Sequence, residues 1–453
     1  MLVSDPFDTS RKPTPGARTR VAIVGSGISG LGAAHGLHDL ADITLLESGD
    51  YFGGHTHTVD MQLPNAQGQM VDFGVDTGFL VLNERTYPNL LALFKTLGVD
   101  IAPSDMSFSV QVPEQPGQRR IEWSGSNLAT VFAQRRNLIS PPFWGMLSDI
   151  LRFNRLCTDM AKQGLDRTDG PLMEPLGDFL KREGFGEAFR HWYFLPMVGC
   201  IWSCPADQML AFPVATMVRF CHNHGLIQVS NRPQWYTVRG GARHYVEAIT
   251  AGIADKRLNS PVRAIVRDAD GAHVHTDRGS ERFDHVVLAC HSDQALALLG
   301  AGASAAERAV LGAIPYQANV AVLHTDTSVL PERRAAWAAW NYERAVDADR
   351  EQARVCLHYW LNALQPLPVE QPVVVSLNPQ GEIDERHVVG RYEYAHPVFD
   401  LAAIRAQTQV PGLQGQQRSH FCGAWMGYGF HEDGLKAGMA AAESVRQALG
   451  VSA

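Results

Sequence analysis

Three glycines near the start of the chain have the spacing of a nucleotide-binding turn. The apolar run 21–24 leads directly into Gly25, Gly27 and Gly30, and a small-residue helical pattern follows. In such a turn the first glycine permits the tight bend, the second lets a pyrophosphate approach the backbone, and the third lets helix and strand pack closely. The N–H groups and dipole at the helix start favour the bound anion. The expected contacts come from Gly25, Ser26, Gly27, Ile28, Ser29 and Gly30.

An acidic residue ends the next predicted strand. The apolar run 43–46 leads into Glu47 and Ser48. Glu47 follows the first glycine by about twenty residues, which is the place of the acid that binds a ribose hydroxyl in dinucleotide-binding folds. These features predict a bound dinucleotide but do not decide between NAD and FAD.

A second glycine-rich segment lies near the other end of the chain. Gly427, Gly429 and Gly434 allow the backbone to come close to a flat ring, and a helix is predicted to begin near 433–434. Its N-terminal dipole would stabilise negative charge on a reduced flavin by roughly 0.3–1 kcal/mol. An ordinary helix-capping loop is the alternative. Because FAD is long, one segment could hold its pyrophosphate and the other its ring.

Taken together, these motifs resemble the flavin-containing amine oxidase superfamily, which includes monoamine oxidases, protoporphyrinogen oxidase and phytoene-type desaturases. More closely they resemble a bacterial branch of predicted NAD/FAD-binding proteins. The further matching segments are Gly53-Gly54 with His55-Thr56, the stretch 72–79, and 237–241 followed by Val262. The resemblance covers nearly the whole chain after about residue 20, and it implies non-covalently bound FAD.

The resemblance also implies roles for individual residues. The first motifs would hold the pyrophosphate and ribose, Val262 would pack beside the adenine, and the C-terminal segment would hold the ribityl chain and ring. The cofactor contacts added in this way are Gly53, Gly54, His55, Thr56, Thr77, Gly78, Val262, Gly423, Asp433, Gly434 and Leu435. The sequence departs from the family pattern at Tyr51 and His55, where arginines are usual, and at Ala424, where an acidic residue is common.

The implied reaction is hydride transfer from a substrate C–H bond to flavin N5, with reoxidation by dioxygen or another acceptor. We assign Tyr428, His431 and Trp425 as candidate catalytic residues. The substrate is either an amine, framed by aromatic rings, or an apolar fatty acyl or isoprenoid-like chain. The aromatic and methionine-rich stretch 191–235 slightly favours the apolar chain as the lining of a substrate pocket, although such a stretch also suits a helical core.

Two other classes of function stay open at this point. One is a flavin-binding scaffold or sensor without turnover, because the family's active-site lysine cannot be located by motif. The other is an NAD-dependent dehydrogenase, which would leave the segment 427–434 without a role. We predict no metal site, since His222-Asn223-His224 lacks further ligands at suitable spacing and reads as a polar turn. His55 and Cys422 are the weaker candidates for covalent flavin attachment.

The elements that must position these residues alternate along the chain. We predict an α/β protein in which a discontinuous Rossmann-type FAD-binding domain (19–86, 236–300 and 416–453) is interleaved with a substrate-binding domain of helices and a mostly antiparallel sheet (87–235 and 301–415). Residues 1–18 are expected to be a disordered lead-in without a secretory signal. We expect no spanning helix, because no apolar stretch of about eighteen residues occurs.

Net charge and cysteine usage limit the kinds of partner and compartment that we expect for this protein. The net charge of −8 and the lack of a basic stripe argue against a nucleic-acid partner. The seven cysteines are scattered without a C-x-x-C motif, which is typical of reduced thiols in a cytoplasmic protein. We therefore expect a cytoplasmic enzyme with a small-molecule or lipid-like substrate, and a homodimer is compatible with the sequence.

Overall fold

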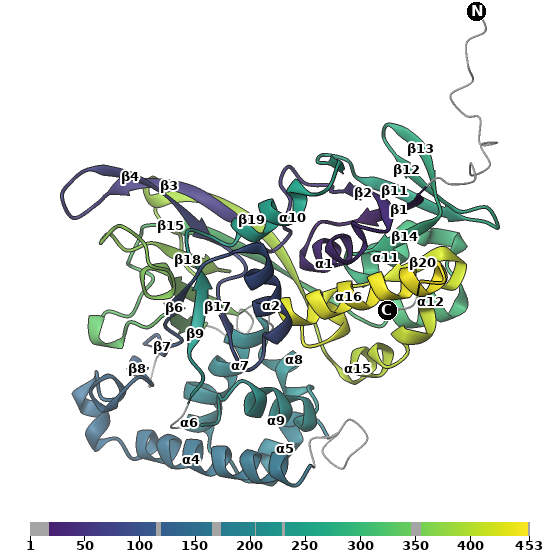
Figure 1. Cartoon of the computed structure of the whole chain (residues 1–453). Helices are drawn as coiled ribbons and strands as arrows, with labels where there is room; N and C mark the ends of the chain where they lie inside the picture. The colour runs from purple at the N-terminus through teal and green to yellow at the C-terminus, as the bar shows by residue number, and fades with distance from the viewer. Residues whose placement is uncertain are drawn as a thin grey trace, which may run out of the picture.

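The computed structural model describes residues 18–114, 119–164, 174–203, 205–228, 232–345 and 355–451. The expected lead-in therefore lies, apart from Arg18, outside the described residues. Two groups of elements are seen in Figure 1: one around β1, α1 and α16, and one around β15, β18 and the helices α4 to α9. In the described part of the chain, no helix combines the length and the apolar character needed to cross a bilayer.

A five-stranded parallel sheet forms the centre of the first group. Its strand order is β10-β2-β1-β14-β20, and every neighbouring pair is parallel. The bounds are β1 Thr19–Val24, β2 Ala41–Leu46, β10 Asp255–Arg257, β14 His285–Leu288 and β20 Ser419–Phe421. All four residues of β14 are buried, as expected for a parallel strand covered on both faces. The predicted α/β fold class is confirmed.

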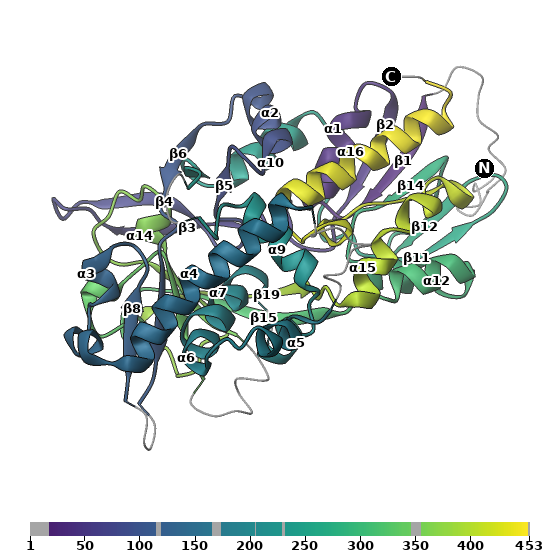
Figure 2. The ribbon, with the colours of Figure 1, turned by 90° about the horizontal axis from the view of Figure 1, so that it is seen from below.

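Helices α1 (Ile28–Leu37) and α16 (His431–Ala448) lie side by side next to this sheet in both Figure 1 and Figure 2. Small residues allow their close approach. A Cβ atom at Gly438 would stand 2.2 Å from the carbonyl oxygen of Ser29, and a Cβ at Gly36 would stand 2.8 Å from Cβ of Ala442. The first and last helices of the described chain thus form one seam.

A seven-stranded sheet with the order β19-β15-β18-β17-β16-β7-β8 forms the second group. The bounds are β7 Phe108–Val112, β8 Ile121–Ser124, β15 Tyr316–His324, β16 Trp340–Glu343, β17 Cys356–Trp360, β18 Val374–Leu377 and β19 Val388–Pro397. Its pairs are antiparallel except β16 with β7, which run parallel. Strand β19, which pairs along most of β15, was not among the strands expected from the sequence.

A helical layer covers this sheet. Its members are α4 Pro141–Lys162, α5 Leu176–Arg182, α6 Glu187–Phe189, a π-helix at Arg190–Phe194, α7 Leu195–Trp202, α8 Ala206–Leu210 and α9 Val214–Asn223. Before them come α3 Leu128–Val131 and the 3-10 helix η1 Arg135–Ile139. Phe153, Phe189 and Phe194 pack together in the buried core of this layer.

The remaining strands and helices pack against one or both of the two groups. They are the hairpin β3 Thr58–Pro64 and β4 Met70–Asp76; the sheet of β5 Leu82–Asn83, β9 Trp235–Val238 and β6 Ile101–Ser104; the sheet of β11 Val262–Arg267, β12 Ala272–Thr276 and β13 Gly279–Phe283; and the helices α2 Pro88–Leu97, α10 Arg243–Ala251, α11 Ser292–Leu299, α12 Ala305–Leu311, α14 Leu361–Leu364 and α15 Leu401–Gln407. Met61 and Val75 of the hairpin belong to the same core as Phe153. The hairpin falls in a segment that we assigned to the FAD-binding domain, and the domain division stays a prediction.

Candidate cofactor and substrate cavity

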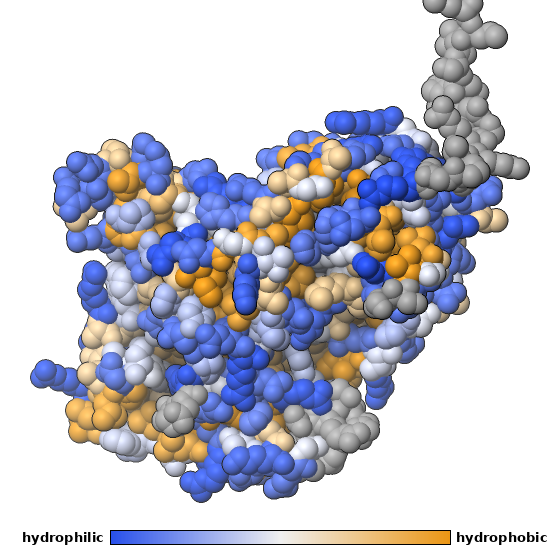
Figure 3. Space-filling view, viewed as in Figure 1, coloured by the Kyte–Doolittle hydropathy of each residue, from blue (hydrophilic) through white to orange (hydrophobic). Residues whose placement is uncertain are grey.

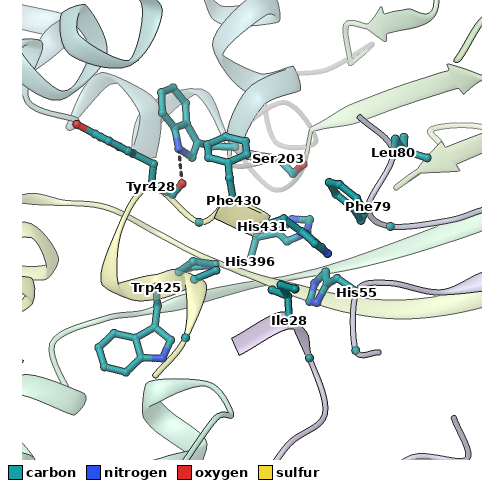
Figure 4. Close-up of a pocket in the computed structure, with 18 of the residues that line it drawn as sticks. Ile28, His55, Phe79, Leu80, Ser203, His396, Trp425, Tyr428, Phe430 and His431 are labelled. Carbon is teal, nitrogen blue, oxygen red and sulfur yellow. Dashed lines mark hydrogen bonds between the residues drawn. The ribbon is translucent and has the colours of Figure 1, made fainter. Parts of the chain in front are cut away.

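One elongated cavity of about 460 Å³ connects the two groups of elements. One end lies where the strands β1, β2, β14 and β20 finish, and is lined by residues 25–29, Glu47, 289–291 and 423–425. The carboxyl ends of parallel strands are the usual ligand site of open α/β sheets. The other end is lined by residues from β7, α7, α9, β16 and β17. Figure 4 shows part of this lining.

The glycine turn has the geometry that its spacing predicts. Gly25 has φ +102°, and a Cβ there would stand 2.8 Å from the carbonyl oxygen of Ala289. A Cβ at Gly30 would stand 2.0 Å from the carbonyl oxygen of Gly25. A Cβ at Gly27 would meet nothing within 4 Å, and Gly27 lines the cavity. The first and third glycines are therefore needed by the fold, whereas the space beside the second is left for a ligand.

Glu47 is held in place before any ligand binds. Its Oε2 accepts hydrogen bonds from the backbone N–H of Ser26 at 2.9 Å and from Ser26 Oγ at 2.6 Å, and its Oε1 accepts from the N–H of Gly49 at 2.9 Å. Ser48 Oγ also donates to Oε1 at 3.2 Å, so about four acceptor positions of the carboxylate are in use and a ribose hydroxyl would replace one of these donors. The N–H of Ser260 donates to the carbonyl oxygen of Glu47 at 2.8 Å, which brings the chain leading to Val262 beside this end.

A cluster of histidines lines the middle of the cavity. The ring of His55 lies 5.3 Å from that of His396 and 6.4 Å from that of His291. Burial, followed by the neighbouring histidines, holds the pKa of His55 well below its usual value, and burial lowers the pKa of His396 to about 4. The Nε2 atom of His55 is buried and has no hydrogen-bond partner among the described residues. A buried polar atom without a partner in a cavity wall suits a bound polar ligand.

His431 lies at the start of α16, stacked on Phe79 with a ring separation of 3.7 Å. A hydrogen bond of 2.8 Å joins His431 Nε2 to Thr56 Oγ1. Burial lowers the pKa of His431 to about 3, so the imidazole is neutral near pH 7. The helix was expected to begin near 433–434, but it begins at His431. The reason is that Asp433 accepts the N–H groups of Tyr428 and Phe430, at 3.0 and 3.1 Å, and so caps an earlier first turn.

The two other candidate catalytic residues also line the cavity. Trp425 donates from Nε1 to the carbonyl oxygen of Cys290 at 3.2 Å, and Trp202 donates from Nε1 to the carbonyl oxygen of Tyr428 at 3.2 Å. In Figure 4 the side chains of Tyr428 and Trp425 point away from each other. The structure therefore does not bring these two rings together as a pair, and their catalytic role stays a prediction.

The expected cofactor contacts divide into two sets. Those that line the cavity are Gly25, Ser26, Gly27, Ile28, Ser29, Glu47, Ser48, Gly53, Gly54, His55, Gly78 and Gly423. Those that lie behind the lining are Gly30, Thr56, Thr77, Val262, Asp433, Gly434 and Leu435. Several members of the second set hold the first in place. Thr77 Oγ1, for example, forms a 2.7 Å hydrogen bond with the hydroxyl of Tyr394, whose ring lies 4.9 Å from that of His55.

Some lining residues were missed by the sequence reasoning. His291 follows β14, and the rule that ligands bind at the carboxyl ends of parallel strands could have found it. His396 lies on β19, where the alternation of Tyr392, Tyr394 and His396 was the available signal. Trp340 and Tyr359 come from paired positions of β16 and β17, which no local pattern could bring together.

The end of the cavity away from the glycine turn is apolar. Its lining includes Met106, Phe108, Met197, Ile201, Trp202, Phe220, Leu226, Trp235, Trp340 and Tyr359. Glu47, at the opposite end, is the only Asp, Glu, Lys or Arg among the described lining residues. The stretch 191–235 contributes both to a helical core and to the cavity lining. Phe194 and Phe212 are core residues, while Trp202 and Phe220 line the cavity.

One group among the described residues has donor atoms at the spacing of a metal site: Glu343, Cys356 and His358, within 4.8 Å of one another. It lies in the seven-stranded sheet, and none of the three lines the cavity. His358 already has partners, since its Nε2 lies 3.0 Å from Glu343 Oε2 and its Nδ1 lies 2.6 Å from Ser376 Oγ. The polar turn predicted at 222–224 is wrong, since His222 and Asn223 end α9, and its C-cap residue His224 stacks on Phe220 and lines the cavity.

Comparison with known proteins places this geometry in context. A family model described as flavin containing amine oxidoreductase matches residues 28–345. Cyclohexylamine oxidase from Brevibacterium oxydans IH-35A superposes with a TM-score of 0.66 at 16% identity, covering 96% of this chain and 100% of that chain. A fatty acid isomerase from P. acnes, which produces CLA, gives a TM-score of 0.62 at 18% identity, covering 93% and 97%.

Putrescine oxidase bound to putrescine gives a TM-score of 0.63 at 16% identity, covering 95% of this chain and 99% of that chain. No curated protein sequence matches at a significant level. At these identities the structural likeness shows the fold alone. The names of the three proteins refer to chemically different molecules, namely a cyclic amine, a diamine and a fatty acid.

Proposed function

Because the chain belongs to the family of flavin-containing amine oxidoreductases, we propose that it is an oxidoreductase that oxidises a substrate C–H bond with non-covalently bound FAD as the hydride acceptor. The observation that carries the proposal is that residues 25–29, 423–425 and 428–431, from near the two ends of the described chain, line one cavity. The same cavity extends to Trp340 and Tyr359 in the second group of elements, which suits a long ligand. We keep the division into an FAD-binding domain (19–86, 236–300, 416–453) and a substrate-binding domain (87–235, 301–415) as part of this proposal.

The residues present suit FAD. Glu47 would accept from the adenosine ribose, and the open space at Gly27 would admit the pyrophosphate. His55, whose buried Nε2 needs a partner, would hydrogen-bond the middle of the ligand. The first turn of α16 would direct its N–H groups toward the ring end. Cys422 is fully buried and lies outside the lining, which supports non-covalent binding.

We propose an apolar chain, fatty acyl or isoprenoid-like, as the substrate. The apolar end of the cavity offers no carboxylate to pair with an ammonium group and no lysine or arginine to pair with an acid. Bringing an unpaired charge out of water into such a site is costly. The bound flavin supplies the hydride acceptor, while this chain's aromatic and methionine side chains hold the substrate and exclude water.

An amine substrate is the second candidate, and one observation favours it. Trp340 and Tyr359 lie edge to face with a ring separation of 4.9 Å in the cavity wall. The face of an indole or phenol ring attracts a cation even where no carboxylate is present. A small amine could therefore bind there through its cationic nitrogen.

The first experiment records the visible spectrum of the purified protein and identifies the flavin released on denaturation. We expect flavin absorption bands and FAD in the extract, and their absence would contradict the proposal. Anaerobic mixing then separates the substrates: unsaturated fatty acyl lipids should bleach the flavin, whereas cyclohexylamine and putrescine should not. Dioxygen is tested as the acceptor by measuring peroxide.

A carboxylate placed at the apolar end gives a sharper test of the substrate. The variant Met106→Glu should slow bleaching by an apolar chain at least tenfold while leaving the flavin spectrum unchanged. Met439→Glu, at a residue 47% exposed on α16, is the matched control. If Met106→Glu instead quickens bleaching by amines, the amine is the substrate.

A further inference from the structure

Large apolar side chains that are exposed concentrate in one short stretch of the chain. Leu128 is 79% exposed, Ile139 is 86% exposed, and Leu138, Trp144 and Leu151 are each about half exposed, at 49%, 50% and 56%. Among the described residues, the other exposed large apolar side chains are those of Met70, Val266, Val389 and Met439, which lie singly on four different elements. Figure 3 shows hydrophobic residues gathered at the lower left, where the segment before α4 lies in Figure 1. We call residues Leu128, Leu138, Ile139, Trp144 and Leu151 the apolar face.

The apolar face is built by defined contacts. Trp144 donates from Nε1 to the carbonyl oxygen of Leu138 at 2.9 Å, and its ring lies 5.4 Å from that of Phe132. Asn127 caps α3 by accepting the N–H of Thr130 at 3.1 Å. Trp144 and Leu151 lie seven residues apart on α4, which places them on the same side of that helix. The exposed side chains are therefore presented by an ordered scaffold.

The charge of this region differs from that of the molecule. The whole chain carries −8, but residues 128–148 contain Arg135 and Arg136 and no acidic residue. Both arginines are exposed on η1, between Leu128 and Leu138. Neither pairs with a carboxylate among the described residues; Arg136 donates instead to the carbonyl oxygen of Arg120. Asp149, the one acidic residue between Leu128 and Leu151, forms an ion pair with Arg152 at 3.1 Å, so the charge of this stretch that has no ionic partner is that of Arg135 and Arg136.

We propose that the apolar face docks this protein on the surface of an anionic phospholipid bilayer. Ile139, Leu138 and Trp144 would enter the boundary between headgroups and acyl chains, and Arg135 and Arg136 would meet the headgroup phosphates. Exposed apolar patches mark interaction sites, and the combination of apolar side chains, an aromatic ring with a polar N–H and flanking cations suits the bilayer interface. In a symmetric contact with a second copy, each copy would bring the unpaired Arg135 and Arg136 to the interface, and its one acid, Asp149, is already paired with Arg152, which disfavours that occupant.

The apolar face is also connected to the cavity through one aromatic core. From Trp144 the ring contacts run through Phe132, Phe143 and Trp123 to Phe108, with separations of 5.4, 5.8, 6.2 and 6.5 Å. Phe108 lines the cavity. Docking would therefore place the apolar end of the cavity on the bilayer side of the molecule, although the docking itself does not depend on which reaction the cavity performs.

Vesicle co-sedimentation tests the proposal. The full chain with its flavin is mixed with vesicles of phosphatidylglycerol and phosphatidylethanolamine, or of phosphatidylcholine alone. We expect binding to the anionic vesicles, weakened at least tenfold in the double variant Leu138→Ser/Ile139→Ser. Arg135→Gln/Arg136→Gln should lose the preference for anionic lipid. The matched control Val266→Ser/Val389→Ser, at residues 53% and 45% exposed elsewhere, should bind as the unaltered protein does.

Unchanged flavin spectra show that the variants are folded, so a docking failure can be told from a failure of the cofactor proposal. Quenching of tryptophan fluorescence by brominated lipid provides the second measurement. The fraction of fluorescence that is lost on vesicle binding should be smaller in Trp144→Phe than in the unaltered protein. Three results would overturn the proposal. They are no binding to anionic vesicles, equal loss in the control variant, or a lipid-free dimer that Leu138→Ser/Ile139→Ser converts to monomer.

Discussion

Gly27 is the residue at which the chain leaves room for its ligand. A Cβ there meets nothing within 4 Å, whereas a Cβ at Gly30, three residues on, would stand 2.0 Å from a carbonyl oxygen. The same glycine motif therefore contains one position required by binding and one required by the fold. A side chain at Gly27 should therefore prevent cofactor binding, whereas a side chain at Gly30 should destabilise the fold.

Gly27→Val and Gly30→Ala should accordingly fail in different ways. We expect Gly27→Val to change the free energy of unfolding of the flavin-free protein by less than about 1 kcal/mol, the scale of an N-cap substitution, while lowering bound flavin at least tenfold. Gly30→Ala should destabilise the flavin-free protein by about 1–3 kcal/mol through overpacking. Denaturant unfolding and the flavin-to-protein absorbance ratio measure the two effects. Equal loss of stability in both variants would contradict the assignment.

His431 gives a pH-dependent prediction at the same scale. Its pKa is lowered to about 3 by burial, against an ordinary value of 6.5. The unfolded chain therefore binds a proton at higher pH than the folded chain, and the stability gained from the neutral imidazole is present above pH 6.5 and lost as the pH falls toward 3. Thermal unfolding of the unaltered protein and His431→Gln should differ most near pH 7.5, and the difference should narrow by pH 4.

The matched control for this titration is His244→Gln, because the side chain of His244 is 50% exposed. Its melting temperature should follow that of the unaltered protein across the same pH range. A constant difference between the unaltered protein and His431→Gln from pH 7.5 to pH 4 would mean that His431 is not held neutral.

At the scale of elements, a row of hydrogen bonds joins four strands of the seven-stranded sheet. The N–H of Asp326 donates to His324 Nδ1, His324 Nε2 lies 2.7 Å from Ser376 Oγ, and Ser376 Oγ lies 2.6 Å from His358 Nδ1. His358 Nε2 in turn lies 3.0 Å from Glu343 Oε2. Because His324 Nδ1 is an acceptor, Nε2 donates to Ser376, Ser376 donates to His358, and His358 donates to Glu343. Every donor in the row has an acceptor without a metal ion.

Ser376→Ala would break this row at its middle. We expect a loss of about 1–3 kcal/mol in the free energy of unfolding, because two buried imidazole nitrogens lose their partner. Ser280→Ala, at an exposed position of β13, should change it by less than about 0.5 kcal/mol. Dialysis against a chelator should leave the melting temperature unchanged. A melting temperature lowered by the dialysis, or an equimolar amount of metal in the protein before dialysis, would instead identify Glu343, Cys356 and His358 as metal ligands.

The elements also show what local sequence can predict here. Strands and helices with a clear apolar period, such as β14 and α2, can be predicted from local sequence, and Gly98, the C-cap of α2, has a left-handed φ of 69° that glycine adopts readily. Strand β19 was missed because its alternating residues are mostly half-exposed and give a weak hydrophobic signal. The residues that it adds to the cavity, His396 among them, were missed with it.

The pairing of distant strands was beyond local patterns. Trp340 and Tyr359 face each other only because β16 pairs with β17, and the parallel pairing of β16 with β7 joins segments more than two hundred residues apart. The glycine turn and Glu47 could be placed from spacing alone because their chemistry fixes a local geometry. The apolar end of the cavity could not, since it is assembled by the tertiary fold.

At the scale of the whole molecule, the cavity is made by segments that are far apart in the sequence. Residues 25–29, Glu47 and 423–425 line one end, and residues 428–431 line the side next to α16. Neither set alone encloses a ligand. Binding energy is therefore expected to depend on a ligand that reaches both sets.

Ligand-dependent stability tests this dependence. Once flavin has been removed, FAD at about one hundred times its dissociation constant should raise the free energy of unfolding by about 2.7 kcal/mol. FMN and ADP, each carrying one half of FAD, should produce much smaller shifts in melting temperature at the same concentration. Equal shifts with ADP and FAD would mean that residues 423–431 do not contact the ligand.

The seam between α1 and α16 has a consequence for how the protein is made. Helix α1 leaves the ribosome early, but the glycine and alanine surface that covers it, at Gly438 and Ala442, is translated some four hundred residues later. At about 5–20 residues per second, that interval lasts roughly 20–80 s. During this interval α1 first has only β1 and β2 beside it, and β14, β20 and the closing helix are added later, so the nascent chain must stay protected, by its own later segments or by chaperones, until its last helix emerges.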